Sequence, residues 1–243
     1  MILIAGGKGF IGTNLCKLFD TLDIGLYETA DLKEGIDVCD IRDTSAYDVI
    51  VLLAANLGQD MDMFQDNLAI YKWAMRQNAH IIYTSSAAVY GDTLEPHKET
   101  DPTPAPTFYG RSKLIGEQLI TQASKRRTIL RLGNVYGDGD GNGAIDIFKR
   151  GGTKIYGDGQ DIRDYVPVQT VCEAIKRIAL DPAKYNCEIF NISSGQPMTT
   201  RAAFASYSKP PYTPEFLPAR GFDVKHSVLN NRKAIAAGLI DEN

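Results

Sequence analysis

Tyr109 and Lys113 stand four residues apart in a segment that is predicted to be helical, so their side chains share one face, a turn apart. An ammonium group beside a phenol favours the phenolate, and we therefore expect a lowered pKa that lets Tyr109 exchange a proton near neutral pH. Ser86 ends a predicted strand and would place a hydroxyl at the carboxyl edge of a sheet. Together the three residues predict proton transfer at an oxygen atom of a bound substrate.

The segment that would position a ligand against these residues is the N-terminal stretch MILIAGGKGFIG. A buried strand over residues 2–5 leads into a turn with the spacing Gly-x-x-Gly-x-x-Gly, formed by Gly6, Gly9 and Gly12. The turn would let the backbone approach a pyrophosphate, and the helix that begins near Phe10 would direct its free N–H groups at the anion. We expect Gly12 to let that helix pack closely. A glycine-rich turn without a ligand is the alternative.

A carboxylate after the second predicted strand bears on the choice of cofactor. Glu28 ends the strand predicted from Asp23 to Tyr27, where an acid accepts hydrogen bonds from the adenosine ribose and repels a 2′-phosphate. No Arg follows in Thr29, Ala30 and Asp31, so the sequence favours NAD over NADP. Two alternatives stay open: Asp31 is close enough to take this role, and Glu28 could be a surface acid.

Strands and helices alternate along the chain, which predicts an α/β fold with a doubly wound, Rossmann-like parallel sheet. The further strands are expected at residues 36–38, 49–55, 81–85, 128–132 and 188–192, with helices over 11–19, 61–77, around Tyr109, and over 166–180. Gly and Asp clusters beyond Gly137 predict a small C-terminal substrate lobe. We expect an NAD-binding domain over residues 1–137, to which 164–194 partly return, and a lobe from 138–163 and 195–243.

Composition excludes several other classes of protein. A net charge of −4 lacks the basic excess of a nucleic-acid binder. Four scattered cysteines without a Cys-x-x-Cys pair indicate reduced thiols, with neither zinc nor disulfides. The segment GDGDGNG lacks the Glu that ends a calcium loop, so we interpret it as turns and expect no metal. No apolar run is long enough to span a bilayer, and we expect a soluble, cytoplasmic protein without a membrane partner.

Five motifs in order resemble the extended short-chain dehydrogenase/reductase family, specifically its nucleotide-sugar epimerases and dehydratases. They run from Met1 to about Ser194 and read GGKGFIG, SSAAVYG, YGRSK, RLGNVYG and YGDGQDIRDYVPV. The resemblance implies that Tyr109 takes a proton from a sugar hydroxyl while NAD takes hydride from the same carbon, and that Ser86 orients the oxygen. Lys113 would hold the nicotinamide ribose and lower the pKa of Tyr109.

The same resemblance assigns the remaining binding residues. The cofactor would contact Glu28 and the glycine turn with the start of its helix, which comprise Gly6, Gly9, Phe10, Ile11 and Gly12. Asp40 and Ile41 would contact adenine. The other cofactor contacts would be Ala54, Ala55, Asn67, Tyr109 and Lys113. The nucleotide sugar would contact Ser86, and its diphosphate would contact Asn134, Arg163 and Arg220. The planar fork of Arg suits phosphate oxygens. For Arg163 the alternative is an ion pair with Asp161 or Asp164.

Dehydratases of this family carry Asp-Glu directly after the Ser or Thr, and this chain has Ala87 and Ala88 there. Elimination is therefore disfavoured, and the sequence predicts an NAD-dependent epimerase that inverts C4 of a UDP-hexose or related sugar through a keto-sugar. A keto-sugar reductase is the alternative, and a non-catalytic nucleotide sensor or scaffold is an alternative of another class. By the same resemblance we expect a homodimer through the helices around Asn67 and Lys113.

Overall fold

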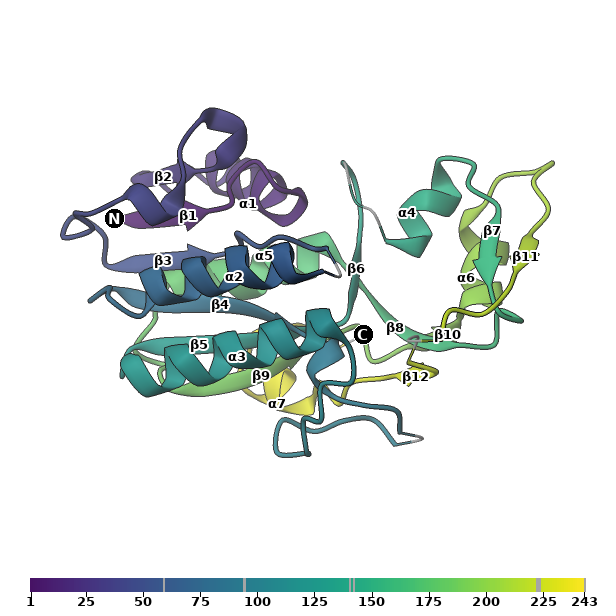
Figure 1. The fold of residues 1–243 in the computed structure, drawn as a ribbon. Coiled ribbons are helices and arrows are strands. Elements are labelled where there is room, and N and C mark those ends of the chain that lie inside the picture. The colour runs from purple at the N-terminus through teal and green to yellow at the C-terminus, as the bar shows by residue number, and fades with distance from the viewer. Residues whose placement is uncertain (59, 94, 140, 142, 222–223, 243) are drawn as a thin grey trace.

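A six-stranded parallel sheet with helices on both faces forms the larger part of the molecule in a computed structural model (Figure 1). The structure describes residues 1–58, 60–93, 95–139, 141, 143–221 and 224–242. The strand order is β2-β1-β3-β4-β5-β9, with all neighbours parallel. This arrangement confirms the predicted α/β fold with a Rossmann-like sheet.

The sheet strands are short; the central ones are largely apolar and buried, whereas the edge strand YETA is partly exposed. Their bounds are β1 Ile2–Ala5, β2 Tyr27–Ala30, β3 Val49–Leu52, β4 His80–Ser86, β5 Arg127–Leu132 and β9 Glu188–Ile192. In β1 and β3 every residue is buried, as expected when helices cover both faces of a parallel sheet. In the register of β4 and β5, Ser85 lies opposite Arg131.

Helices α1 (Phe10–Thr21) and α5 (Val168–Leu180) pack together on one face of the sheet. Helices α2 (Met61–Ala74) and α3 (Phe108–Ala123) pack together on the other face, toward the viewer in Figure 1. Two separate apolar cores fill the space between the helices and the sheet. The side chain of Thr107 accepts a hydrogen bond from the N–H of Gly110 and thereby fixes the start of α3.

A smaller group of elements lies beyond the carboxyl ends of the strands, at the right of Figure 1. Its sheet contains β10 (Pro197–Thr199), β8 (Ile162–Pro167) and β12 (His226–Ser227), and β6 (Asn134–Tyr136) pairs with β8. The remaining elements of this region are α4 (Ala144–Lys149), β7 (Lys154–Tyr156), α6 (Thr200–Tyr207) and β11 (Glu215–Leu217). Helix α7 (Arg232–Ala236) returns to the large sheet and contacts β9.

Several predicted elements differ from the structure: the strand expected at 49–55 ends at Leu52 and the helix expected over 61–77 ends at Ala74. The strand expected at residues 36–38 is wrong, because Val38–Asp40 forms a turn of 3-10 helix capped by the carboxylate of Asp37. The second strand begins only at Tyr27, since Asp23 and Leu26 have φ of 51° and 85°, which an extended strand does not tolerate. The helix expected from residue 166 begins at Val168, because the two preceding residues belong to β8.

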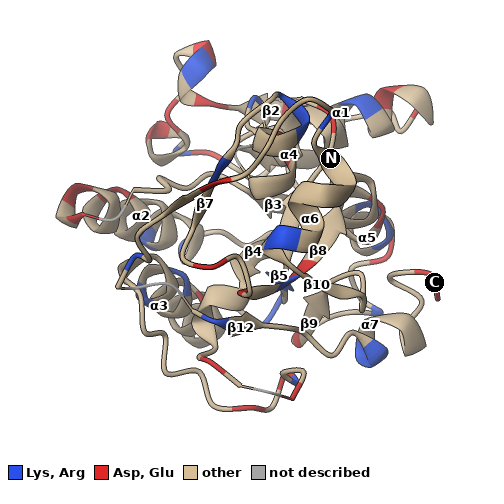
Figure 2. Ribbon diagram, turned by 90° about the vertical axis from the view of Figure 1, so that its right-hand side faces the viewer, with Lys and Arg blue, Asp and Glu red and all other residues tan. Residues whose placement is uncertain are grey.

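The charged residues follow no single pattern on the ribbon. Figure 2 shows Lys and Arg positions lying among Asp and Glu positions, in keeping with the net charge of −4. Within the described part of the chain, every helix is too short or too polar to cross a membrane.

Candidate active site

Three adjoining cavities follow the carboxyl edge of the large sheet. The sheet-edge cavity, of about 500 Å³, lies over β1, β2 and β3. The central cavity, of about 320 Å³, shares Gly6, Gly9 and Ala55 with it. The lobe cavity, of about 380 Å³, shares Ser86 and Tyr109 with the central one and reaches into the smaller lobe. An elongated ligand could therefore occupy all three, at the edge where doubly wound sheets bind ligands.

The glycine turn forms one wall of the central cavity, which is lined by Gly6, Gly9, Phe10, Ile11 and Gly12. A Cβ atom on Gly12 would lie 2.2 Å from the carbonyl oxygen of Gly6, so only glycine lets α1 start this close to the turn. Gly9 precedes α1 without any side-chain hydrogen bond at the helix start. The N-terminal end of α1 thus presents backbone N–H groups and its positive dipole end to the cavity, as an anion site requires.

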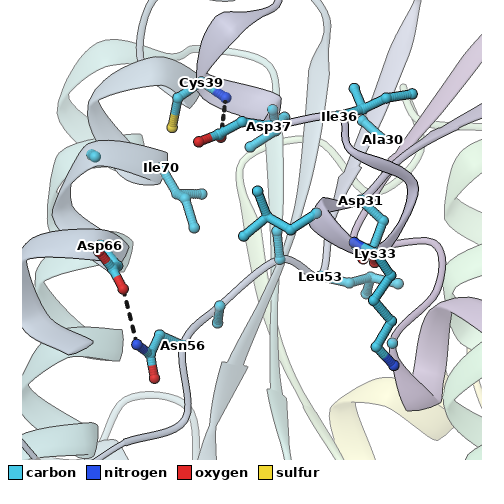
Figure 3. A pocket seen from close by; sticks show the side chains of 17 residues that line it. Ala30, Asp31, Lys33, Ile36, Asp37, Cys39, Leu53, Asn56, Asp66 and Ile70 are labelled. Carbon is cyan, nitrogen blue, oxygen red and sulfur yellow. Dashed lines mark hydrogen bonds between the residues drawn. The ribbon is translucent and has the colours of Figure 1, made fainter. Parts of the chain in front are cut away.

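The sheet-edge cavity contains the carboxylate of Asp31, which comes directly after β2 (Figure 3). Its two oxygens accept hydrogen bonds from the N–H groups of Lys8 and Lys33, both at 2.9 Å. Glu28 lies inside β2 rather than at its end, is exposed, and accepts a hydrogen bond from the hydroxyl of Tyr47. The structure therefore does not bring Glu28 to the cavity, and Asp31 occupies the position that was expected for it.

The far end of the sheet-edge cavity is lined by Asp37, Val38 and Cys39, and Figure 3 shows the Asp37 carboxylate bonded to the N–H of Cys39. The two residues expected at adenine lie next to this wall. Asp40 is exposed, and the carbonyl of Ile41 accepts a hydrogen bond from the indole of Trp73 at 2.9 Å. Neither residue lines the cavity.

Ala54 and Ala55 line the cavity as expected, whereas Asn67 lies behind its wall. The Asn67 side chain is fully buried, accepts from the N–H of Asn56 and donates to the carbonyl of the same residue. It also donates to the hydroxyl of Ser112 on α3 at 3.1 Å. Asn67 therefore fixes the loop after β3 against α3 and positions Asn56, which does line the cavity.

The structure brings Ser86, Tyr109 and Lys113 together in the central cavity. Ser86 ends β4, and the other two residues come from the first turns of α3. The ammonium of Lys113 lies 5.8 Å from the centre of the Tyr109 ring and donates to the carbonyl of Thr84 at 2.9 Å. This is the arrangement of hydroxyl, phenol and ammonium that the sequence predicted.

Burial dominates the proton affinities of these groups. It raises the pKa of Tyr109 to about 12, although a hydrogen bond with Ser86 acts in the opposite direction. Burial also lowers the pKa of Lys113 to about 8, against the attraction of the Glu117 carboxylate. The pKa of Tyr109 is therefore raised rather than lowered as expected, because burial disfavours the phenolate.

All four residues expected to bind substrate line the lobe cavity: Ser86, Asn134, Arg163 and Arg220. The guanidinium of Arg163 donates to the carbonyls of Ile162 and Lys225 and lies 3.7 Å from the Asp161 carboxylate. Arg220 packs over the ring of Tyr156, with 4.4 Å from its guanidinium carbon to the ring centre. Two guanidinium groups in one cavity suit the oxygens of a diphosphate.

The sequence analysis did not identify the buried polar residues beneath the central cavity. Thr84 accepts from Lys113, and Glu117 forms a buried ion pair with Arg131. The spacing of four residues places Lys113 and Glu117 on one helix face, whereas no sequence spacing indicates Arg131 as the partner of Glu117. Among the described residues no cluster of His, Cys, Asp or Glu could hold a metal ion, and Asp140 and Asn142 of the GDGDGNG segment lie outside them.

Comparison with known proteins identifies the family of this chain. A model described as the NAD dependent epimerase/dehydratase family matches residues 2–193. The chain belongs to this family. The match confirms the resemblance to extended short-chain dehydrogenases/reductases, and the family's own description supports NAD as the cofactor.

Three similar proteins illustrate the range of the family. The chain is 26% identical to dTDP-L-rhamnose 4-epimerase of Burkholderia thailandensis, over 97% of this chain and 88% of that protein. It is 34% identical to UDP-glucose 4-epimerase of Mycolicibacterium smegmatis, over 63% of this chain and 54% of that protein. The structure of UDP-glucose 4-epimerase with UDP-glucose from Thermotoga maritima matches with a TM-score of 0.81 and 25% identity, over 98% and 92% of the two chains. The chain covers only 54 to 59% of the length of two curated relatives.

Proposed function

We propose that this protein is an NAD-dependent nucleotide-sugar epimerase that inverts C4 of a UDP-linked or related hexose. The observation that carries the proposal is the meeting of Ser86, Tyr109 and Lys113 between a cavity at the glycine turn and a cavity with two guanidinium groups. The similar 4-epimerases support the choice of reaction. Within the family, we expect the activity of a UDP-galactose 4-epimerase.

The side chains of this chain would perform the proton chemistry. Bound NAD would supply a hydride acceptor and donor and a positive charge near Tyr109. The Tyr109 phenolate would take the proton of the sugar hydroxyl, to which Ser86 would donate a hydrogen bond. The Lys113 ammonium would stabilise the phenolate, while Arg163 and Arg220 hold the diphosphate as the sugar turns between the two hydride transfers.

The cofactor contacts that we propose differ from the sequence assignment at three places, one of which is Asn67, because it lies outside the cavity lining. Asp31, rather than Glu28, would accept hydrogen bonds from the adenosine ribose, because its carboxylate lies in the sheet-edge cavity. Val38 and Cys39, rather than Asp40 and Ile41, would contact adenine. The remaining assignments, to the glycine turn, Ala54 and Ala55, agree with the cavity lining.

Ala87 and Ala88 argue against dehydration as the reaction. Both line the lobe cavity beside Ser86, and neither side chain can donate or accept a proton. An elimination needs an acid and a base at neighbouring sugar carbons, and this wall of the cavity supplies none. A keto-sugar reductase, which would release oxidised cofactor at each turnover, uses the same three residues and remains the second candidate.

The decisive experiment starts with the protein purified without added cofactor. After denaturation, mass spectrometry and absorbance should identify NAD at close to one molecule per chain. The native protein should then interconvert UDP-glucose and UDP-galactose, or another pair of 4-epimeric nucleotide sugars, in a proton NMR assay. Tyr109→Phe should reduce turnover by a factor of about 100 or more while NAD stays bound.

A matched control is Tyr212→Phe, which makes the same chemical change at an exposed ring of the smaller lobe and should leave turnover unchanged. An empty protein that oxidises NADH or NADPH with a keto-sugar would support the reductase. Unchanged cellular function in Tyr109→Phe with unchanged NAD binding would support a non-catalytic sensor or scaffold. Homodimer formation through α2 and α3 and a cytoplasmic location stay predictions.

A further inference from the structure

Lys113 is a buried cation whose one hydrogen-bond acceptor among the described residues is an uncharged carbonyl. Its side chain is 4% exposed, and its ammonium donates to the Thr84 carbonyl at 2.9 Å. Burial without a countercharge favours the neutral amine, which could neither attract a phenolate nor hold a ribose as firmly. The fold must therefore supply negative charge close to Lys113.

Glu117 supplies that charge from the same face of α3, one turn after Lys113. Its carboxylate is buried and forms a two-point ion pair with Arg131, with Nε–Oε1 at 3.0 Å and Nη2–Oε2 at 2.7 Å. The hydroxyl of Ser85, next to Ser86, donates to Oε1 at 2.5 Å. The carboxylate is thus held by three donors.

Arg131 extends this connection to the loop that follows Ser86. Its guanidinium donates to the hydroxyl of Tyr90 at 2.7 Å and to the carbonyl of Glu99 at 3.1 Å. The pair consequently connects α3, β4, β5 and the loop beneath the catalytic residues. Of these segments, α3 carries Tyr109 and Lys113, and β4 ends at Ser86.

Stability alone is a weak reason for such a pair, because two apolar residues of similar volume often fill a buried site equally well. An electrostatic role requires that no other negatively charged group lies as close to Lys113 as Glu117 does. The ionisable groups that face Lys113 from the elements packed around it are Tyr109 and Glu117 on α3, Tyr83 on β4, Tyr71 on α2, and Arg131 on β5 behind the carboxylate. Glu117 is the one carboxylate in this set.

We propose that Glu117 is a positioning residue that, clamped by Arg131 and Ser85, keeps Lys113 charged and in place beneath the central cavity. The inference rests on the proposed function for the role of Lys113, but its test does not require turnover. It predicts that the charge of Glu117, and not only its packing, controls the ionisation of Lys113.

The test is a pH titration of the cofactor-free full chain labelled with 13C at the lysine ε-carbon, in which Lys113→Met identifies the Lys113 resonance. In Glu117→Gln the midpoint for Lys113 should fall by about 1 to 2 pH units from its wild-type value, as expected for the loss of a unit charge one helical turn away at an effective dielectric of about 20 or more. Ser85→Ala, which keeps the charge, should shift the midpoint far less. Glu173→Gln makes the same chemical change on α5, where the partner is Lys176, and is the matched control.

A second variant keeps the test decisive if Glu117→Gln folds poorly with Arg131 left unpaired. Glu117→Gln with Arg131→Met removes both charges, and the midpoint for Lys113 should remain below the wild-type value while stability recovers. An unchanged midpoint in Glu117→Gln, or complete return to the wild-type value in the double variant, would overturn the proposal. Absence of epimerase turnover alongside the expected titration would refute the proposed function and leave the effect of Glu117 on Lys113 intact.

Discussion

Replacing Gly110 by alanine should separate catalysis from folding in this protein. Gly110 follows Tyr109 in α3, and a Cβ atom there would lie 2.2 Å from the carbonyl oxygen of Ala88 and 3.0 Å from its carbonyl carbon. Ordinary contact begins near 3.4 Å, so α3 and the turn after Ser86 would have to separate by about 1 Å. That displacement acts directly on the distance between Tyr109 and Ser86.

The expected effects on rate and stability differ in size. A displacement of about 1 Å at catalytic groups typically reduces turnover by a factor of about 100. The strain of overpacking costs about 1 to 3 kcal/mol, and replacing a helical glycine by alanine returns up to about 1 kcal/mol. We therefore expect a net loss of about 0 to 2 kcal/mol in the free energy of unfolding, which leaves the variant folded.

Turnover, NAD affinity and urea unfolding of Gly110→Ala should be measured beside those of Gly25→Ala. Gly25 has no atom within 4 Å of the position of an added Cβ, so this control should match the wild type in all three measurements. Turnover of Gly110→Ala within about threefold of the wild type would refute the reasoning. It would mean that the close approach of α3 to Ala88 does not determine the geometry of Tyr109 and Ser86.

Three further predictions follow from the same contacts. Because burial lowers the pKa of Lys113 to about 8, the unfolded chain holds this proton more tightly than the folded chain does. The free energy of unfolding should therefore rise with pH by up to roughly 3 kcal/mol between pH 8 and 10.5, and urea titrations of Lys113→Met should lack this rise. Asp31→Ser should weaken NAD binding by about tenfold and reduce the preference over NADP, as measured by calorimetry with both nucleotides, whereas Glu28→Gln should change neither. Arg163→Gln should raise KM for a nucleotide sugar by about 10- to 100-fold with a smaller change in kcat, and an unchanged KM would show that the Asp161 ion pair is its main role.

Local sequence was sufficient for the parts of the site that depend on neighbouring residues. The glycine turn after an apolar strand, and the helical spacing of Tyr109 and Lys113, involve residues within a few positions of one another, and backbone geometry alone brings them together. Apolar runs that alternate with helical segments likewise determined the class of sheet, because the central strands must bury both of their faces. The order of the five motifs was sufficient for the family, which the family model confirms.

Tertiary structure decided which acid lines the cavity and in which direction the pKa of Tyr109 shifts. The end of β2 depends on its pairing with β1, where Ala5 lies opposite Ala30, and this register brings Asp31 rather than Glu28 to the sheet edge. Burial reversed the expected direction of the pKa change at Tyr109. The ion pair of Glu117 and Arg131 joins a helix to a strand that sequence spacing cannot bring together. These outcomes depend on hydration and on contacts between distant segments, which only the folded chain defines.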